Sequence, residues 1–161
     1  MTVQFMKISI ITVSYNSAST IGHTIESVLS QTYSDIEYII IDGQSTDNTV
    51  EIIKEYEPKF SGRLKWISQA DESLYDAMNK GIQMASGEIV GTINSDDFYH
   101  RNDTIELIAK GFSEDANVQL VFGDIRFVSP KNIKKTVRYY SSENFSPKRF
   151  RFGFMPPHPT F

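Results

Sequence analysis

The run Ile36-Glu37-Tyr38-Ile39-Ile40-Ile41 is short, mostly β-branched and apolar, and it stops at Asp42-Gly43. A second apolar run, residues 88–93, stops in the same way at Asn94-Ser95-Asp96-Asp97. Each pattern predicts a buried strand that delivers acidic side chains to its carboxyl end. In an open α/β sheet, ligands bind at that edge. Two acidic strand ends therefore indicate a divalent metal together with a polar, phosphate-bearing ligand.

Strand and helix patterns alternate along most of the chain. We expect strands over residues 7–13, 36–41, 64–68, 88–93 and 118–122, with helices over 21–29, from near 47, over 74–85 and over 103–112. Strands that alternate with helices of about ten residues are typical of βαβ units. The predicted class is α/β, with a mostly parallel sheet flanked by helices on both faces. After Pro130 the regularity fades into a basic and aromatic tail that includes Tyr139, Tyr140, Phe145, Phe150, Phe152 and Phe154.

The helix patterns also predict local contacts. Ser17 or Ser19 is the expected cap of the first helix, and Asn48 with Glu51 the expected capping box of the second. The helix over 74–85 has the clearest amphipathic pattern, with polar residues on one side. Its apolar side, which we expect to be buried, holds Leu74, Met78, Ile82 and Ala85.

Length and composition are those of one globular domain, divided here into a core over residues 1–130 and a tail over 131–161. The sequence has no cysteine, no long apolar run and no signal-peptide pattern, so we expect a cytoplasmic setting. Residues 1–130 hold 9 Lys and Arg against 19 Asp and Glu, whereas residues 131–161 hold 7 against 1. The basic tail is either a solvated face or a contact for phosphates or anionic lipid at the inner face of a membrane. Nucleic acid is not an expected partner, because the chain as a whole is acidic.

Each candidate site residue also has a purely structural interpretation. Asp96 and Asp97 are either turn residues or a pair of carboxylates whose repulsion a hard divalent cation relieves. Asp42 either caps a turn or accepts hydrogen bonds from a nucleobase or a ribose. Tyr15 either packs in its loop or stacks on a base. Lys80 lies on a helix face that solvation alone explains. The fingerprints of dinucleotide-binding folds, P-loops and nucleophile elbows are absent from the sequence.

Taken together, four blocks resemble family-2 glycosyltransferases of the GT-A fold, a Rossmann-like architecture. The blocks are 10–16, 30–32, 41–49 and 94–97, and they occur in the family's order within residues 7–125. Residues 71–81 resemble a subgroup of bacterial enzymes that build surface polysaccharides. The chain departs from the family pattern at Gln44, where the second acid of one block is missing, and at Asn94, the first position of the Asp-x-Asp region.

The resemblance implies a nucleotide-diphosphate sugar donor, most often UDP-linked, and Mn²⁺ or Mg²⁺ as cofactor. It places Val13 and Tyr15 beside the base and Asp42 at the uracil or ribose. Asp97 is the first candidate for direct metal ligation, with Asp96 orienting the ribose or the waters of the metal site. Asn79 and Lys80 fall where the family lines the donor pocket.

The implied reaction is inverting transfer of the sugar to an acceptor hydroxyl, either a saccharide or a lipid-linked saccharide. A general base must take the acceptor's proton. The family carries this base well downstream of the metal site, so we expect it beyond Phe161 and expect the chain to be truncated. Two alternatives stay open: a non-catalytic sugar-nucleotide-binding module, and, less favoured, a sugar nucleotidyltransferase. The number of subunits also stays open, a homodimer included.

Overall fold

The computed structural model describes residues 6–143, 145, 146, 148, 151, 160 and 161. The expected aromatic positions Phe150, Phe152 and Phe154 lie outside this set. The elements in chain order are β1 (Ile8–Ser14), α1 (Ile21–Leu29), β2 (Ile36–Asp42), α2 (Thr49–Tyr56), the short 3-10 helix η1 (Glu57–Phe60), β3 (Leu64–Ser68), α3 (Leu74–Met84), β4 (Ile89–Thr92), α4 (Thr104–Glu114), β5 (Ile125–Ser129) and β6 (Asn132–Tyr140).

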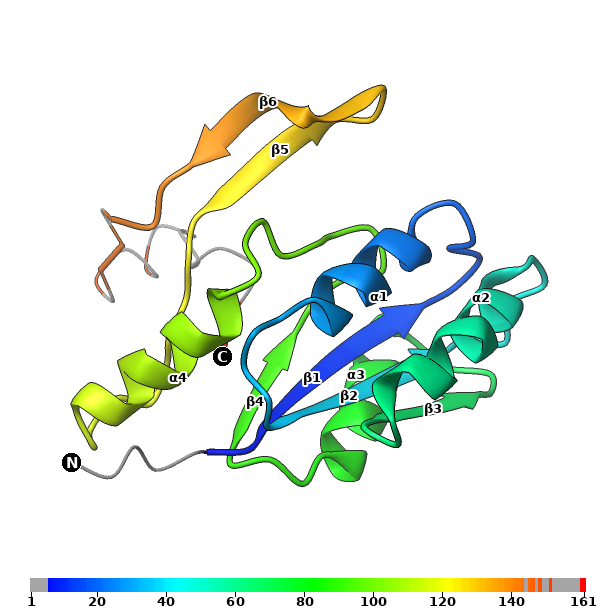
Figure 1. Cartoon of the computed structure of the whole chain (residues 1–161), viewed down its shortest axis with the longest axis horizontal. Coiled ribbons are helices and arrows are strands. Elements are labelled where there is room, and N and C mark those ends of the chain that lie inside the picture. The colour runs from blue at the N-terminus through cyan, green and yellow to red at the C-terminus, as the bar shows by residue number, and fades with distance from the viewer. Residues whose placement is uncertain (1–5, 144, 147, 149–150, 152–159) are drawn as a thin grey trace.

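The first four strands form a parallel sheet in the order β3-β2-β1-β4 (Figure 1). The chain moves outward from β1 through β2 to β3, and then crosses to the other side of β1 to enter β4. The direction of winding therefore reverses between β1 and β4, which is where the crevice of an open α/β sheet forms. The predicted α/β class with a mostly parallel sheet is confirmed.

The sheet separates two apolar cores, because successive side chains of a strand point to opposite faces. Ile8, Ile10 and Tyr38 pack on the face covered by α1 and α2. Ile11 and Ile39 pack on the face covered by α3. The strands are buried on both sides, which explains why their sequences are continuously apolar instead of alternating.

Helix α3 buries only part of the face that its pattern predicts, because Met78 and Ala85 pack against the core from partly buried positions while the other two residues do not. Leu74 and Ile82 are 53% and 51% exposed, whereas Ala77 and Gly81 are buried. The reason is close packing: a Cβ added to Gly81 would lie 2.5 Å from Cγ2 of Ile11 in β1. Small residues let the helix approach the sheet, so the larger apolar side chains flank the contact.

Of the predicted helix caps, only the position of Asn48 is confirmed. Thr20 and Asn48 occupy the N-cap positions of α1 and α2, and neither makes a side-chain capping bond. At α2 the preceding Asp47 accepts a hydrogen bond from the Thr49 amide (3.0 Å). Near α1, the carbonyl of Ser17 accepts from the backbone amide of Ile21 (2.9 Å). Caps depend on one or two dihedral angles, which residue spacing does not determine.

The region after α4 differs most from expectation. The predicted strand over 118–122 is reduced to one antiparallel bridge between Phe122 and Thr160. The segment expected to be irregular forms the antiparallel hairpin β5–β6, which Figure 1 shows standing away from the parallel sheet. The β-branched and aromatic run at 136–140, preceded by a turn at Pro130, is the signal that would have found it.

A buried carboxylate links the amino ends of the strands. Glu37 in β2 is 3% exposed and forms ion pairs with Lys65 of β3 (2.6 Å) and with Lys7 (3.4 Å). Its oxygens also accept hydrogen bonds from Ser9 in β1 (2.7 Å) and from Ser86, which precedes β4. One side chain thus ties together all four strands of the sheet. We name Glu37, Lys65, Lys7, Ser9 and Ser86 the Glu37 clamp.

Tyr99 gives a test of the core near β4. Its side chain is buried against Phe161, and within the described part of the chain its hydroxyl has no hydrogen-bond partner. A buried hydroxyl without a partner costs about 1–3 kcal/mol. We expect Tyr99→Phe to raise the free energy of unfolding by about 1 kcal/mol, measured by urea denaturation, with Tyr75→Phe, at a side chain that is 74% exposed, as the control. A loss of stability would mean that the hydroxyl is satisfied.

Candidate functional site

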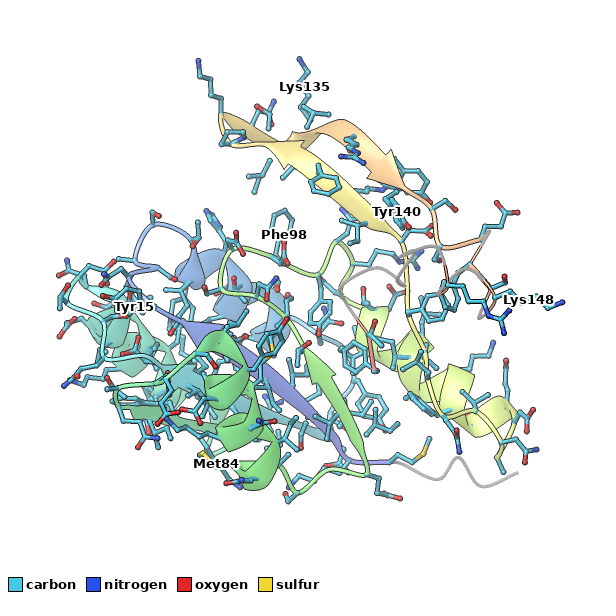
Figure 2. The ribbon with its side chains drawn as sticks, turned by 180° about the vertical axis from the view of Figure 1, so that it is seen from behind. Tyr15, Met84, Phe98, Lys135, Tyr140 and Lys148 are labelled. Atoms are coloured by element: carbon cyan, nitrogen blue, oxygen red, sulfur yellow. The ribbon has the colours of Figure 1, made fainter. Side chains whose placement is uncertain are left out.

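The carboxyl ends of the strands carry most of the predicted site residues. Ser14 of β1 pairs with Asp42 of β2, and Asp42 pairs with Ser68 of β3, so the three strands end at one level. Val13 is buried beneath this edge, whereas Tyr15 projects from it and is 65% exposed (Figure 2). A tyrosine held at the rim with its ring free is suited to stacking on a planar group.

Asp42 is fully buried and lies among serines. It accepts hydrogen bonds from the hydroxyls of Ser14 (3.2 Å), Ser45 (2.5 Å) and Ser68 (2.7 Å), and from the Ser45 amide (2.9 Å). These four donors come from β1, from the loop after β2 and from the end of β3. In this arrangement Asp42 fixes the three loops that surround the crevice, and a ligand would have to replace one of the serine hydroxyls to reach it.

The turn at Gly43 brings two further groups to the rim. A Cβ placed on Gly43 would lie 3.2 Å from the carboxylate of Asp71 and 3.5 Å from the ring of Tyr15. Asp71 in turn binds the ammonium of Lys80 (2.5 Å), which also pairs with Asp76 (2.9 Å). Tyr15, Gly43, Asp71 and Lys80 are therefore neighbours, although 65 residues separate the first from the last.

Lys80 owes its position to α3. Ser73 caps the helix by accepting a hydrogen bond from the Asp76 amide, and Lys80 lies one turn after Asp76 on the same side. Hydrogen bonds to Asp71 and then Asp76 raise the pKa of Lys80, and the bond to Lys80 lowers the pKa of Asp76. The lysine is therefore a fixed positive charge at the rim. The predicted residue Asn79 lies beside it in the helix and is exposed.

The loop after β4 presents the two adjacent carboxylates. Asp96 and Asp97 are both exposed, and the side-chain amide Nδ2 of Asn94 donates a hydrogen bond to a carboxylate oxygen of Asp97 (3.2 Å). The hydroxyl of Thr24 in α1 donates a hydrogen bond to the backbone carbonyl of Asp97 (2.7 Å). Asn94, an apparent departure from the family pattern, thus orients the second aspartate.

A hydrogen bond joins the loops on either side of the crevice. The hydroxyls of Ser17, after β1, and Ser95, after β4, lie 2.9 Å apart. The connection spans the point where the winding of the sheet reverses, so the Tyr15 loop and the Asp97 loop are positioned together. Sequence reasoning did not single out Ser17 and Ser95 as partners, because nothing in their spacing signals the contact.

The carboxylate pair fits a metal that a ligand helps to hold. Within the described residues, no group of three or more acidic or histidine side chains could enclose a metal by itself. Mg²⁺ usually takes only one or two protein carboxylates and fills its remaining positions with water and substrate phosphates. Asp96 and Asp97, exposed on one loop, are a donor set of that kind.

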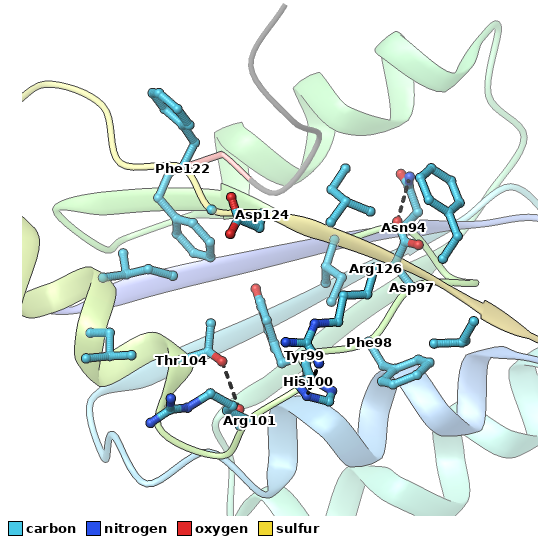
Figure 3. Close-up of a pocket in the computed structure, with 18 of the residues that line it drawn as sticks. Asn94, Asp97, Phe98, Tyr99, His100, Arg101, Thr104, Phe122, Asp124 and Arg126 are labelled. Carbon is cyan, nitrogen blue, oxygen red and sulfur yellow. Dashed lines mark hydrogen bonds between the residues drawn. The ribbon is translucent and has the colours of Figure 1, made fainter. Parts of the chain in front are cut away.

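A pocket of about 860 Å³ lies beside the carboxylate loop (Figure 3). It is walled by the segment 93–101, by α4 and by β5, and its lining is largely apolar, including Leu107, Val121, Phe122 and Phe161. Asp96 and Asp97 line one end of it. The carboxylate loop therefore belongs both to the carboxyl edge of the sheet and to this pocket. The predictions from sequence include Asp96 and Asp97 of its lining and miss the apolar walls.

Comparison with known proteins identifies the family of the chain. The family described as Glycosyl transferase family 2 matches residues 9–159. A PGL/p-HBAD biosynthesis glycosyltransferase of Mycobacterium bovis is 33% identical over 117 residues, which cover 73% of this chain and 46% of that protein. An uncharacterized glycosyltransferase of Nostoc is 40% identical over 94 residues, or 58% of this chain and 29% of that one. The chain thus spans less than half the length of these curated relatives.

Solved structures share the fold. TarS 1-349 of S. aureus in complex with UDP-GlcNAc superposes with a TM-score of 0.71 at 25% identity, over 80% of this chain and 37% of that one. The mannosyltransferase PcManGT of Pyrobaculum calidifontis, in complex with GDP-Man and Mn²⁺, has a TM-score of 0.69 at 21% identity, over 81% and 38% of the two chains. At that identity the second comparison speaks for the fold alone.

Proposed function

The chain belongs to glycosyl transferase family 2, and from that premise we propose that it serves the transfer of a sugar from a nucleotide-diphosphate donor to an acceptor hydroxyl. The observation that carries the proposal is the carboxyl edge of the sheet at the reversal of winding. An exposed aromatic ring, a rim lysine and an exposed carboxylate pair meet there, and they suit the base, the phosphates and a metal of a nucleotide sugar.

In this proposal each predicted residue has a separate role. Tyr15 stacks on the base above the buried Val13, and Asp42 contributes to the base or ribose site together with the serines that it holds. Lys80 and Asn79 line the donor side of the crevice. Asp97 binds Mn²⁺ or Mg²⁺, and Asp96 orients the ribose or shares the metal. When bound, the metal stabilises the negative charge that develops on the departing diphosphate.

A UDP-linked donor is proposed first. It is supported by the complex of TarS with UDP-GlcNAc, which matches 80% of this chain. We further propose that the transfer inverts the anomeric centre and that the product belongs to a bacterial surface glycan. The biosynthetic glycosyltransferases of mycobacteria that match most of the chain are consistent with this.

Transfer requires a base that takes the proton of the acceptor hydroxyl, and Asp124 is a carboxylate at the pocket that could be considered for this role. Asp124 lines the pocket but accepts hydrogen bonds from the Ser142 amide (2.7 Å), the Tyr139 hydroxyl and the Ser142 hydroxyl. These bonds lower the pKa of Asp124, which makes it a weaker base. A second candidate function is therefore donor binding by this chain without transfer.

Calorimetric titration with UDP tests the proposal. We expect UDP to bind in the presence of Mn²⁺ and to lose most of its affinity when a chelator removes the metal. Incubation with UDP-sugars then separates transfer, or slow hydrolysis of the donor, from binding alone. Folded protein that binds no UDP under either condition would contradict the UDP donor, and a parallel titration with GDP would show whether another nucleotide takes its place.

A further inference from the structure

We propose that the β5–β6 hairpin is a docking surface for anionic lipid bilayers. The hairpin, residues 125–140, holds Arg126, Lys131, Lys134, Lys135 and Arg138 and has no acidic residue. All five basic residues are exposed. The proposal goes beyond sugar transfer and does not depend on it.

The hairpin also exposes apolar side chains on a scale unusual for a soluble surface. Phe127 and Ile133 are each 45% exposed, Tyr139 53% and Val137 61%. Every residue of β6 from Asn132 to Tyr139 is exposed, whereas Ile125, Val128 and Ser129 of β5 are partly covered. A two-stranded hairpin is marginally stable in water when it stands alone. A surface that accepts both cations and apolar groups would stabilise it, and the headgroup region of a bilayer is such a surface.

The separation of charge between the basic hairpin and the acidic body would orient the protein on an anionic surface. Residues 1–124 hold 19 Asp and Glu against 8 Lys and Arg, so the body is repelled by anionic lipid. Figure 2 shows Lys135 at the end of the hairpin farthest from the parallel sheet. Screening in physiological salt limits such forces to about 8 Å. The hairpin can therefore approach the lipid surface ahead of the acidic body, whose repulsion salt screening weakens.

Two aromatic contacts preserve the cationic character of the hairpin. The guanidinium of Arg126 lies 5.9 Å from the ring of Tyr139, and that of Arg138 lies 5.3 Å from the ring of Phe127. Cation–π contacts place the charge beside an apolar ring without neutralising it. Arg126, Phe127 and Tyr139 also line the pocket, where Arg126 contacts His100 and Tyr139 donates to Asp124. The charges of the hairpin that are offered to lipid are therefore those of Arg138 and the three lysines.

The position of the hairpin connects this surface to the pocket. Ile125, Arg126, Val128 and Tyr139 belong to the hairpin and also line the pocket beside Asp96 and Asp97. A protein docked through the hairpin would therefore hold the pocket close to the lipid surface. An acceptor anchored in the membrane could reach the pocket without leaving the bilayer.

Vesicle flotation with the full chain tests the proposal. We expect binding to vesicles of phosphatidylcholine mixed with phosphatidylglycerol, little binding to phosphatidylcholine alone, and release by high salt. Each basic residue near an anionic surface contributes about a fivefold gain in affinity. The double variant Lys134→Ser/Lys135→Ser should therefore bind about 25-fold more weakly. The matched control, Lys54→Ser/Lys110→Ser, removes the same charge from α2 and α4 and should bind like the wild type.

Variants of apolar residues distinguish docking on a bilayer from purely electrostatic attraction to its charges. Val137→Ser should weaken vesicle binding several-fold, whereas Leu120→Ser, an exposed position outside the hairpin, should not. Three outcomes would overturn the proposal: equal loss in both lysine pairs, equal affinity for duplex DNA, or concentration-dependent dimerisation through the hairpin in place of vesicle binding. UDP titration of the same variants is unaffected by these outcomes, so a failure here leaves the proposed function standing.

Discussion

Asp97→Ala is expected to weaken metal-dependent UDP binding by at least about 100-fold while leaving the fold intact. Even residues that only support metal ligands commonly cost 10–100-fold when they are replaced, and a direct ligand should cost at least as much. Asp97 is exposed and its carboxylate accepts from Asn94 in the same loop. Its removal opens no cavity, so the free energy of unfolding should change by less than about 0.5 kcal/mol.

The measurement is calorimetric titration of UDP with and without Mn²⁺ for the wild type, Asp97→Ala and Asp96→Ala. Asp115→Ala, an exposed acid just after α4, controls for the loss of one negative charge. We expect Asp96→Ala to lose less affinity than Asp97→Ala. If Asp97→Ala binds UDP and Mn²⁺ as the wild type does, the assignment of the metal to this loop is wrong.

Glu37→Gln is expected to cost about 3 kcal/mol of stability at neutral pH. Burial alone raises the pKa of Glu37, but hydrogen bonds from Lys65, Ser9 and Ser86 outweigh it and lower the pKa to about 2. A carboxyl whose pKa falls from about 4.5 to about 2 on folding stabilises the folded state by roughly 3 kcal/mol above pH 5. That contribution is lost as the pH falls through the folded pKa, because the group is then protonated in both states.

Urea denaturation of the wild type and Glu37→Gln at a series of pH values between neutrality and acid tests the sign as well as the size. The difference in unfolding free energy should be largest near neutrality and shrink steadily below about pH 4.5. Glu55→Gln, an exposed position on α2, should differ little from the wild type throughout. A constant difference across the pH range would show that Glu37 acts through packing and not through its charge.

Much of the sheet could be predicted from the sequence because parallel strands buried on both faces leave a strong signal. The runs at 36–41 and 88–93 are continuously apolar and end at acidic residues, and the structure places them as β2 and β4. Helix α3 shows the limit of the method. Its pattern gives the bounds to within one residue but only part of the buried face, because the approach of Gly81 to Ile11 depends on the distance between two elements.

The candidate site could be predicted where it follows directly from strand ends. Tyr15, Asp42, Asp96 and Asp97 lie at the predicted edge of the sheet, and their ligands stay proposals. The contacts among Gly43, Asp71 and Lys80 and the bond between Ser17 and Ser95 could not be predicted, since each joins loops distant in sequence. The pocket depends on β5, which the sequence did not reveal as part of a hairpin.

The Glu37 clamp lies at the amino ends of the strands, at the edge opposite to the proposed ligand site. The stability that the Glu37 clamp provides therefore comes from residues other than those proposed to bind ligands. The carboxyl-edge loops should be exchangeable among related chains as a pair: a chimera that receives another protein's segments after both β1 and β4, and so keeps a matched contact in place of Ser17–Ser95, should keep the host's melting temperature and acquire the donor's nucleotide preference. Directed evolution toward a new sugar donor could thus concentrate on those two loops, with Glu37, Lys65, Ser9 and Ser86 left unchanged as the framework.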